Sequence, residues 1–282
     1  MSASVATTPL VGFAYRRHYR AALHEAERGP DVLELMAETF DPRLPGRVDD
    51  VRALRERYAL VGHSVGLSIG SVERPPQAYL DALARFVELV QPRVYSDHFA
   101  VTYAGGRDLG HLTPIWYGEQ ALEVVVRNLT AARRLLGVPI CLEIIAEPFA
   151  LPGAQWDQAR FAAEVWRACG CGIHLNVTNV FINARNSGRC PRAFIAALPA
   201  EAVQMIHAVG FGRYEHGELA DTHDEDIQHE LWDLLAYTFT RVRPATAVIE
   251  RDGNFPPYAS LLAEVDRMRS LAARPEALPC RR

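Results

Sequence analysis

Residues 59–98 read ALVGHSVGLSIGSVERPPQAYLDALARFVELVQPRVYSDH, and this stretch decides the fold. Two short apolar runs, Ala59–His63 and Arg93–Ser96, flank a segment from Pro76 to Val90 in which apolar residues recur at i, i+3 and i+4. The short runs predict buried strands, and the spacing between them predicts a helix. A strand–helix–strand order is typical of parallel strands, because the helix carries the chain back to the starting edge of the sheet.

The same alternation continues on both sides of this unit. Further strands are predicted at Leu10–Ala14, Val32–Leu35, Pro139–Glu143, Gly172–Asn176, Ala202–His207 and Ala245–Glu250. Further helices are predicted at Gly118–Leu136, Trp156–Ala168, Gln228–Phe239 and Tyr258–Leu271. Eight strands separated by helices predict an α/β protein, a single (β/α)8 TIM-type barrel of roughly 250 residues. The alternative is an open doubly wound sheet with a glycine-rich phosphate turn, and the loop Gly66–Gly70 does not match that motif.

The chain is expected to form one domain. Residues 1–282 contain no internal repeat and no linker rich in Pro, Gly or Ser. The barrel core is expected from about residue 10 to residue 271, followed by a frayed tail over Ala272–Arg282.

The composition is that of an ordinary globular protein. Hydrophobic residues make up 49%, charged residues make up 23%, and the formal net charge is −4. We expect no nucleic acid partner, which would call for a basic patch, and no membrane partner, because no apolar run is long enough to span a bilayer. Met1–Pro9 lacks the features of a signal peptide, so a cytoplasmic protein is expected. The five cysteines are odd in number, include no C-x-x-C pair, and are expected to be free thiols.

Polar side chains mark the ends of the later predicted strands. They are His63, His98, Glu143, Asn176, His207 and Glu250, and the loop after the seventh strand adds Asp221 and His223. The carboxyl ends of parallel barrel strands meet on one rim, where the active sites of such barrels lie. Imidazoles and carboxylates together suit Fe, Mn, Zn or Ni, and this set is too large for one ion. The pattern therefore predicts two or three metal ions bridged by carboxylates.

Taken singly, each of these residues has a simpler interpretation. A histidine at a strand end is more often a hydrogen-bonded structural group than a ligand. Glu143 or Glu250 could pair with Arg251, and residues 221–224 could form a polar turn or a helix cap. Convergence on one rim favours the metal site. The other histidines, His174 among them, have no such company and are expected to be surface, helix, lid or core residues.

Some patterns are weaker. Glu34 and Glu38 could support the site or line a substrate pocket. Asn179, Asn183 and Arg185 follow the sixth predicted strand and are weak candidates for substrate binding. Asn183 and Arg185 could equally hold a long loop in place.

Taken in order, the motifs resemble those of the multinuclear non-haem iron-dependent oxidative enzymes, the MbnB/TglH-like family that modifies ribosomally made peptides. The motifs are Gly62–Ser71, Ser96–His98, Leu142–Glu143, Asn176–Val180, Ile206–His207, Ala220–Asp224 and Ile249–Asp252. The resemblance implies a (β/α)8 barrel with a centre of two or three irons in mixed Fe(II)/Fe(III) form. By position in the motifs it implies these ligands: His63, His98, Glu143, Asn176, His207, Asp221, His223 and Glu250. The family usually has Asp where this chain has Asn176.

The resemblance also implies an activity and partners. Members whose chemistry is known modify cysteine residues and use O2 as co-substrate. They usually act with a small partner protein that recognises the leader segment of the precursor. The expected substrate is therefore a cysteine-containing precursor peptide, and no catalytic residue is expected beyond the metal centre.

Two other functions fit the same residues. Barrel sugar isomerases and phosphodiesterases use similar rings of His, Glu and Asp with Mn or Zn. A lysine at a strand end would favour sugar isomerisation, and this chain has no lysine. A non-catalytic peptide-binding scaffold is the second alternative, and the neutral Asn176 keeps it open.

Overall fold

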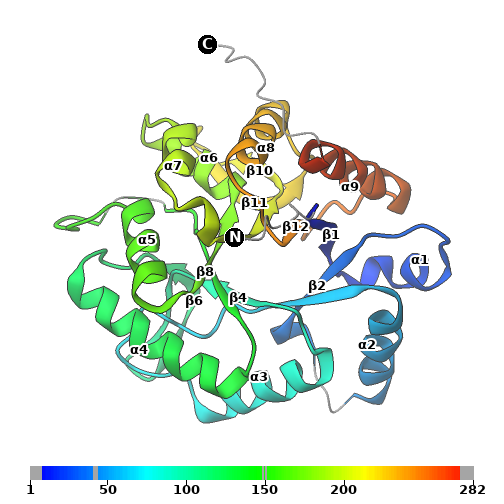
Figure 1. The fold of residues 1–282 in the computed structure, drawn as a ribbon, viewed down its shortest axis with the longest axis horizontal. Helices are drawn as coiled ribbons and strands as arrows, with labels where there is room; N and C mark the ends of the chain where they lie inside the picture. Colours follow the sequence, from blue (N-terminus) through cyan, green and yellow to red (C-terminus); the bar gives the residue numbers. More distant parts are fainter. Residues whose placement is uncertain (1–7, 41–43, 148, 150, 274–282) are drawn as a thin grey trace, which may run out of the picture.

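The computed structural model describes residues 8–40, 44–147, 149 and 151–273. Eight parallel strands close into a barrel in the order β1-β12-β9-β8-β7-β4-β3-β2, and helices surround it (Figure 1). The predicted (β/α)8 barrel is therefore confirmed. The barrel strands are β1 (Leu10–Ala14), β2 (Val32–Met36), β3 (Ala59–His63), β4 (Tyr95–His98), β7 (Ile140–Glu143), β8 (Gly172–Asn176), β9 (Val203–Ala208) and β12 (Thr246–Ile249).

The helices connect these strands on the outside of the barrel. They are α1 (Arg20–Glu25), α2 (Pro45–Arg57), α3 (Gln77–Val90), α4 (Glu119–Leu136), α5 (Gln158–Cys169), α6 (Val177–Asn186), α7 (Pro191–Ala197), α8 (His229–Arg241) and α9 (Tyr258–Ala273). Short 3-10 turns lie at Arg17–Tyr19, Ala37–Thr39 and Ala200–Ala202. Of the expected frayed tail, Ala272 and Ala273 belong to α9, and the rest lies outside the described residues.

Local signals fix the helix ends. The Asp157 carboxylate accepts a hydrogen bond from the Arg160 amide at 2.8 Å and caps the start of α5. Gly137 ends α4 with a φ of 68°, a left-handed conformation that glycine adopts without steric cost. These caps explain why the predicted helix ends lie close to the observed ones.

Two hairpins extend the carboxyl rim and were not predicted. One pairs β5 (Val101–Ala104) with β6 (Arg107–Thr113) after β4, and the other pairs β10 (Gly210–Arg213) with β11 (Leu219–Glu225) after β9. β6 is largely exposed and β11 carries four charged or imidazole side chains in its last five residues, so neither strand alternates between apolar and polar residues. The prediction that Asp221 and His223 lie in a loop is therefore wrong, because both residues lie on β11.

The barrel interior begins with an apolar layer. Its buried cluster consists of Ala14, Val32, Val61, Val94, Cys141, Met205 and Val248. These residues come from β1, β2, β3, β7, β9 and β12 and from the position just before β4, and strands that lie so far apart around the barrel meet in its interior. Because strand side chains alternate between faces, the residues two positions further along each strand also face the interior, one layer nearer the carboxyl rim.

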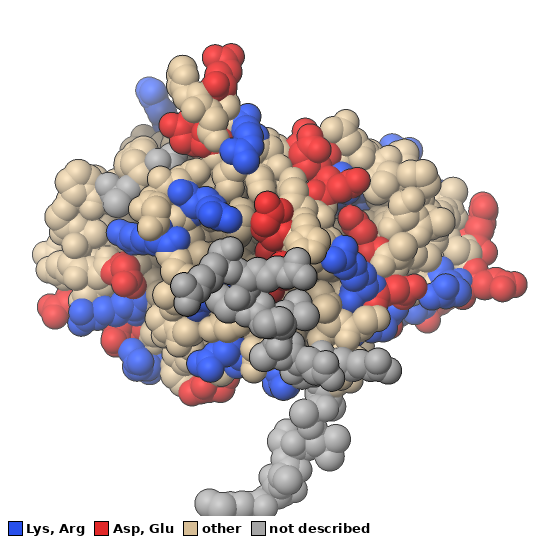
Figure 2. All heavy atoms as spheres, turned by 90° about the horizontal axis from the view of Figure 1, so that it is seen from above, with Lys and Arg blue, Asp and Glu red and all other residues tan. Residues whose placement is uncertain are grey.

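The surface carries both signs of charge. Acidic and basic side chains are interspersed over the face that Figure 2 presents. Among the described residues, no helix combines the length and the apolar character that crossing a membrane requires.

Candidate metal centre

The second interior layer is polar, in contrast to the first. Two residues after Val32, Val61, Cys141, Met205 and Val248 come the following side chains: Glu34, His63, Glu143, His207 and Glu250. All five are at most 3% exposed. The strand alternation that builds the apolar layer therefore also delivers imidazoles and carboxylates to one buried level of the barrel.

Glu143 lies at the middle of this level. Its Oε2 atom is 3.5 Å from His63 Nε2, 3.6 Å from His98 Nε2, and 3.4 Å from both His174 Nδ1 and His207 Nδ1. Four strands besides β7, namely β3, β4, β8 and β9, thus place an imidazole nitrogen around one carboxylate oxygen. This Oε2 atom has no hydrogen-bond partner among the residues that the structure describes.

The contacts continue from Glu143 to a second carboxylate. His207 Nδ1 also lies 3.3 Å from Oε2 of Glu250, and the same Oε2 lies 3.3 Å from His223 Nδ1. His223 Nε2 is 2.7 Å from Asp221 Oδ1. His223 adopts a left-handed φ of 56°, which is uncommon for a residue other than glycine and is found at functional sites. The β10–β11 hairpin therefore folds its His223 down onto the rim.

The structure thus brings every strand-end candidate into one contact network. The interpretation of residues 221–224 as a separate turn or cap does not hold, because Asp221 contacts His223, and His223 in turn contacts Glu250. Arg251 does not pair with Glu143 or Glu250 as the simpler interpretation suggested; it contacts Asp226 Oδ1 at 2.7 Å. Arg16 is the guanidinium near Glu250, at 3.7 Å.

His174 is a core residue, one of the places expected for the remaining histidines, but the expectation that it has no ligand-type neighbours is wrong. It is fully buried, but its Nδ1 lies 3.4 Å from Glu143, and its ring centroid lies 3.9 Å from that of His207. The sequence does contain a sign that His174 belongs to the site, because His174 lies two positions before Asn176 on the same predicted strand. Side chains at i and i+2 of a strand share a face.

Asn176 uses both ends of its amide. Its Nδ2 donates to Oε1 of Glu143 at 2.9 Å, and its Oδ1 accepts from the Asn179 amide at 3.0 Å, which caps α6. Strand β8 therefore runs directly into α6, and the amide ties the helix start to the central carboxylate.

Burial favours the neutral form of two imidazoles in the network, whereas nearby carboxylates raise the pKa of two others, His207 and His223. Burial lowers the pKa of His98 to about 4, and burial with the nearby His207 holds the pKa of His174 well below its ordinary value. Burial acts against the charged forms of His207 and Glu143 as well. The carboxylates of Glu34, Glu143 and Glu250 nevertheless raise the pKa of His207, and the imidazoles of His207, His174 and His98 lower the pKa of Glu143. Neutral imidazoles beside ionised carboxylates are the protonation states that bind metals.

The donor set fits metal ions in both spacing and chemistry. Two atoms that each lie about 2.1 Å from one ion are about 3.0–3.5 Å apart, which matches most of the contacts around Glu143 and Glu250. Several buried atoms that could bind a metal lack a hydrogen-bond partner among the described residues. They are His98 Nδ1, Glu143 Oε2, both ring nitrogens of His174, and His207 Nδ1. Four groups of closely spaced ligand atoms could each hold an ion: Glu34–His174–His207, His63–Glu143–His174, Glu143–His207–Glu250 and His223–Glu250–Asp252. A nitrogen and oxygen donor set of this kind suits Fe, Mn or Zn.

Other polar residues near the rim have structural contacts. The Asp97 carboxylate accepts hydrogen bonds from Ser64 Oγ (2.5 Å) and the Leu67 amide (3.0 Å), and burial raises its pKa to about 7. Asn183 Oδ1 accepts from the Glu147 amide at 2.7 Å, so it holds the loop after β7. The Arg185 guanidinium lies over the ring of Phe181. Substrate binding by Asn183 and Arg185, and by Asn179, stays a prediction.

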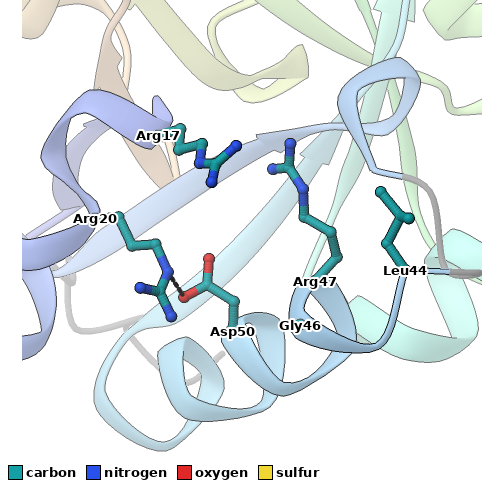
Figure 3. A pocket seen from close by; sticks show the side chains of 6 residues that line it. All are labelled: Arg17, Arg20, Leu44, Gly46, Arg47 and Asp50. Carbon is teal, nitrogen blue, oxygen red and sulfur yellow. Dashed lines mark hydrogen bonds and ion pairs between the residues drawn. The ribbon is translucent and has the colours of Figure 1, made fainter.

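Two pockets lie among the loops and helices that follow β1 to β4. The first, of about 470 Å³, is lined by Arg17, Arg20, Leu44, Gly46, Arg47 and Asp50. Figure 3 shows the guanidinium groups of Arg17 and Arg47 extending into it, with Arg20 bonded to Asp50. The second, of about 460 Å³, lies between the loop after β3 and the β5–β6 hairpin, and Tyr79 and Tyr103 contribute to its walls. Residues of both pockets follow barrel strands at their carboxyl ends, as the candidate metal ligands do.

Solved structures share the fold of this chain. The D-psicose 3-epimerase from Clostridium cellulolyticum is similar with a TM-score of 0.56 at 10% identity, covering 92% of this chain and 91% of that one. Endonuclease IV from Thermus thermophilus is similar with a TM-score of 0.55 at 17% identity, covering 94% and 99%. At these identities the likeness shows the barrel fold alone.

Sequence relatives are closer. A UPF0276 protein of Bordetella bronchiseptica is 36% identical over 275 residues, covering 95% of this chain and 94% of the relative. A UPF0276 protein of Chromobacterium violaceum is 33% identical, covering 90% and 91%. Residues 10–273 match the family described as RiPP precursor modification enzyme MbnB/TglH/ChrH, where RiPP denotes a ribosomally synthesised and post-translationally modified peptide. With the barrel, the network of imidazoles and carboxylates and this match over nearly its whole length, the chain belongs to the MbnB/TglH/ChrH family of RiPP precursor modification enzymes.

Proposed function

We propose that this chain is an iron-dependent enzyme that uses O2 to oxidise a cysteine residue of a ribosomally made precursor peptide. The observation that carries the proposal is the position of Glu143 Oε2, within 3.4–3.6 Å of four imidazole nitrogens. A buried carboxylate oxygen that accepts no hydrogen bond is unfavourable, and a cation between it and the four nitrogen atoms would compensate its charge. The further contacts through His207 to Glu250 support two or three ions rather than one.

The chain's own residues would hold and orient the reactants. Bound iron would supply the electrons for O2 chemistry and a Lewis acid for the substrate thiolate. Glu143 and Glu250 would hold the ions together with the imidazoles that each contacts from two or more strands. The burial of His63 and His98, at 1% and 6% exposure, keeps bulk water away from their side of the centre. Arg16 lies between Glu250 and Asp252, where its charge offsets part of the local excess of carboxylates.

The substrate would reach the centre from the rim. The pocket between Arg17 and Arg47 suits a carboxylate of a peptide, because guanidinium groups bind carboxylates with paired hydrogen bonds. The pocket with Tyr79 and Tyr103 offers apolar and aromatic walls for a neighbouring side chain. A small partner protein would hold the leader segment of the peptide, as the resemblance implies. A precursor made on the ribosome would meet the enzyme in the cytoplasm.

The test is an assay with the precursor peptide encoded beside this chain and its leader-recognition partner. The protein is purified anaerobically, loaded with Fe(II) and exposed to O2, and tandem mass spectrometry locates any mass change on the peptide. We expect two or more Fe per chain and a modified cysteine. The His98→Ala variant should lose both, whereas His229→Ala, which removes an exposed imidazole on α8, should lose neither. An iron-loaded protein that leaves every cysteine unmodified, or a protein that binds only zinc, would contradict the proposal.

A further inference from the structure

His174 is a buried histidine that the protein fold alone does not account for. It is fully buried, and neither ring nitrogen has a hydrogen-bond partner among the described residues. Buried polar side chains are nearly always hydrogen-bonded, because an unsatisfied one costs free energy. His174 therefore does not have the hydrogen bonds that a purely structural core histidine would make.

The surroundings of His174 are those of a ligand. Its Nδ1 points at the unpartnered Oε2 of Glu143, 3.4 Å away, and its ring packs edge-on against the rings of His63 and His207. His63, Glu143 and His174 each offer a ligand atom, and these three atoms lie within 4.8 Å of one another. Only Glu143 among the three carries a full charge when both imidazoles are neutral. A divalent ion would be attracted by the carboxylate and bound through the two nitrogen lone pairs.

The other inward-facing residue at the end of β8 is less suited to binding a metal. The Asn176 amide donates to Glu143 Oε1 and accepts from the Asn179 backbone, so both of its polar atoms already have partners. An amide oxygen is also neutral and a poor bridge between ions. Strand β8 thus presents two side chains to the same centre: the Asn176 amide, whose polar atoms are hydrogen-bonded, and the His174 imidazole, whose nitrogens are not.

We propose that His174 is a metal ligand of this chain, and that with His63 and Glu143 it holds one divalent transition-metal ion at the inner level of the barrel. Asn176 then acts on the metal only through Glu143, whose orientation it fixes. This inference rests on the proposed metal centre and adds a ligand that lies outside the set implied by the resemblance.

The experiment compares metal binding by the wild type and His174→Leu. The substitution removes both ring nitrogens and introduces an apolar side chain of similar size. Thr246→Val is the matched control, because the Thr246 hydroxyl is likewise buried and without a partner among the described residues, but Thr246 lies at the start of β12, where it pairs with Leu10 and Met205. Each apo protein is titrated anaerobically with Fe(II) and with Co(II), and bound metal is counted by elemental analysis. Circular dichroism and the Tm of the apo proteins check the fold.

We expect His174→Leu to bind one ion fewer per chain, or to bind one ion at least tenfold more weakly, while Thr246→Val binds as the wild type does. The apo Tm of His174→Leu should equal or exceed that of the wild type, since an unsatisfied buried group has been removed. Unchanged stoichiometry and affinity in His174→Leu would overturn the inference and leave the proposed function standing. A wild type that binds no metal would overturn both. If His174→Leu does not fold, anomalous diffraction from Co(II)-loaded wild-type crystals decides: an ion bonded to a ring nitrogen of His174 supports the inference, and ions bonded elsewhere overturn it.

Discussion

His207 Nε2 and Glu34 Oε2 lie 2.9 Å apart, although the two residues are 173 positions apart in the chain. This contact leaves the opposite nitrogen, Nδ1, facing Glu143 and Glu250. A carboxylate that accepts the proton of one ring nitrogen fixes the tautomer and the direction of the lone pair on the other. Glu34, a weak candidate from sequence, is thus placed to orient a ligand.

Replacing Glu34 by Gln should weaken metal binding by about 10–100-fold, the usual effect of removing a carboxylate that supports a histidine ligand. The dissociation constant from anaerobic Co(II) titration measures this effect. Glu34→Asp should restore part of the affinity, and Glu27→Gln on the exposed surface should have no effect. Equal affinities for Glu34→Gln and the wild type would show that Glu34 does not orient His207.

Asn176→Asp should destabilise the metal-free protein and widen the gap in Tm between metal-free and metal-loaded forms. The change replaces the donor to Glu143 Oε1 with a second carboxylate at about 2.9 Å, and like charges this close repel. Calorimetry with and without Fe(II) measures the gap. Asn176→Ala is the control, because it removes the amide without adding charge. A gap no wider in Asn176→Asp than in Asn176→Ala would argue against charge repulsion at this position.

The Asp50 carboxylate should make stability depend on pH. Burial acts to raise its pKa, but hydrogen bonds from Tyr15 (2.6 Å) and the contact with His24 (2.7 Å) prevail, helped by the charge of Arg20, and the pKa is lowered. A lowered pKa in the folded state contributes stability that is present above the unfolded pKa of about 3.9 and is lost as the pH falls through the folded value.

Asp50→Asn should therefore lower the free energy of unfolding by about 1–3 kcal/mol at pH 7. The difference from the wild type should shrink below about pH 4. Guanidinium denaturation at a series of pH values measures both, with the 74% exposed neighbour changed in Asp49→Asn as control. A difference that stays constant from pH 7 to pH 3 would mean that the charge of Asp50 is not what stabilises the fold.

The exposed thiol of Cys190 should be alkylated before the two buried thiols of Cys141 and Cys171. Burial raises the pKa of Cys141 to about 12 and also raises that of Cys171, whereas Cys190 is exposed. Because the thiolate is the reactive form, iodoacetamide at pH 8 should alkylate Cys190 in the native protein and reach Cys141 and Cys171 only after unfolding. Peptide mapping identifies the modified residues. Rapid native labelling of Cys141 would show that the layer beneath the metal centre is open to solvent.

Much of the fold was predictable because the barrel strands are short apolar runs with helices of clear periodicity between them. β3 matches its prediction residue for residue, and β4 begins two residues later than expected. The β10–β11 hairpin was missed because its residues owe their strand structure to pairing with each other rather than to burial of an apolar face. Local patterns cannot register such pairing.

The candidate ligands were predictable for a related reason. Residues such as His63 and Glu143 end strands, and parallel topology carries strand ends to one rim. His174 and Glu34 were harder to assign because they lie within strands rather than at their ends. Their role depends on which face of the strand points inward, and that is set by the closure of the barrel.

The polar layer above Cys141 and its apolar neighbours has a consequence for the life of the protein in a cell. This layer consists of buried imidazoles and carboxylates such as His63, Glu143 and Glu250, and cations that neutralise the carboxylates would stabilise the folded state. Any ion that binds only the native form adds to stability by mass action. On the proposed centre, metal supply would set how long each molecule survives proteolysis, so scarcity of iron would lower the abundance of the enzyme as well as its turnover.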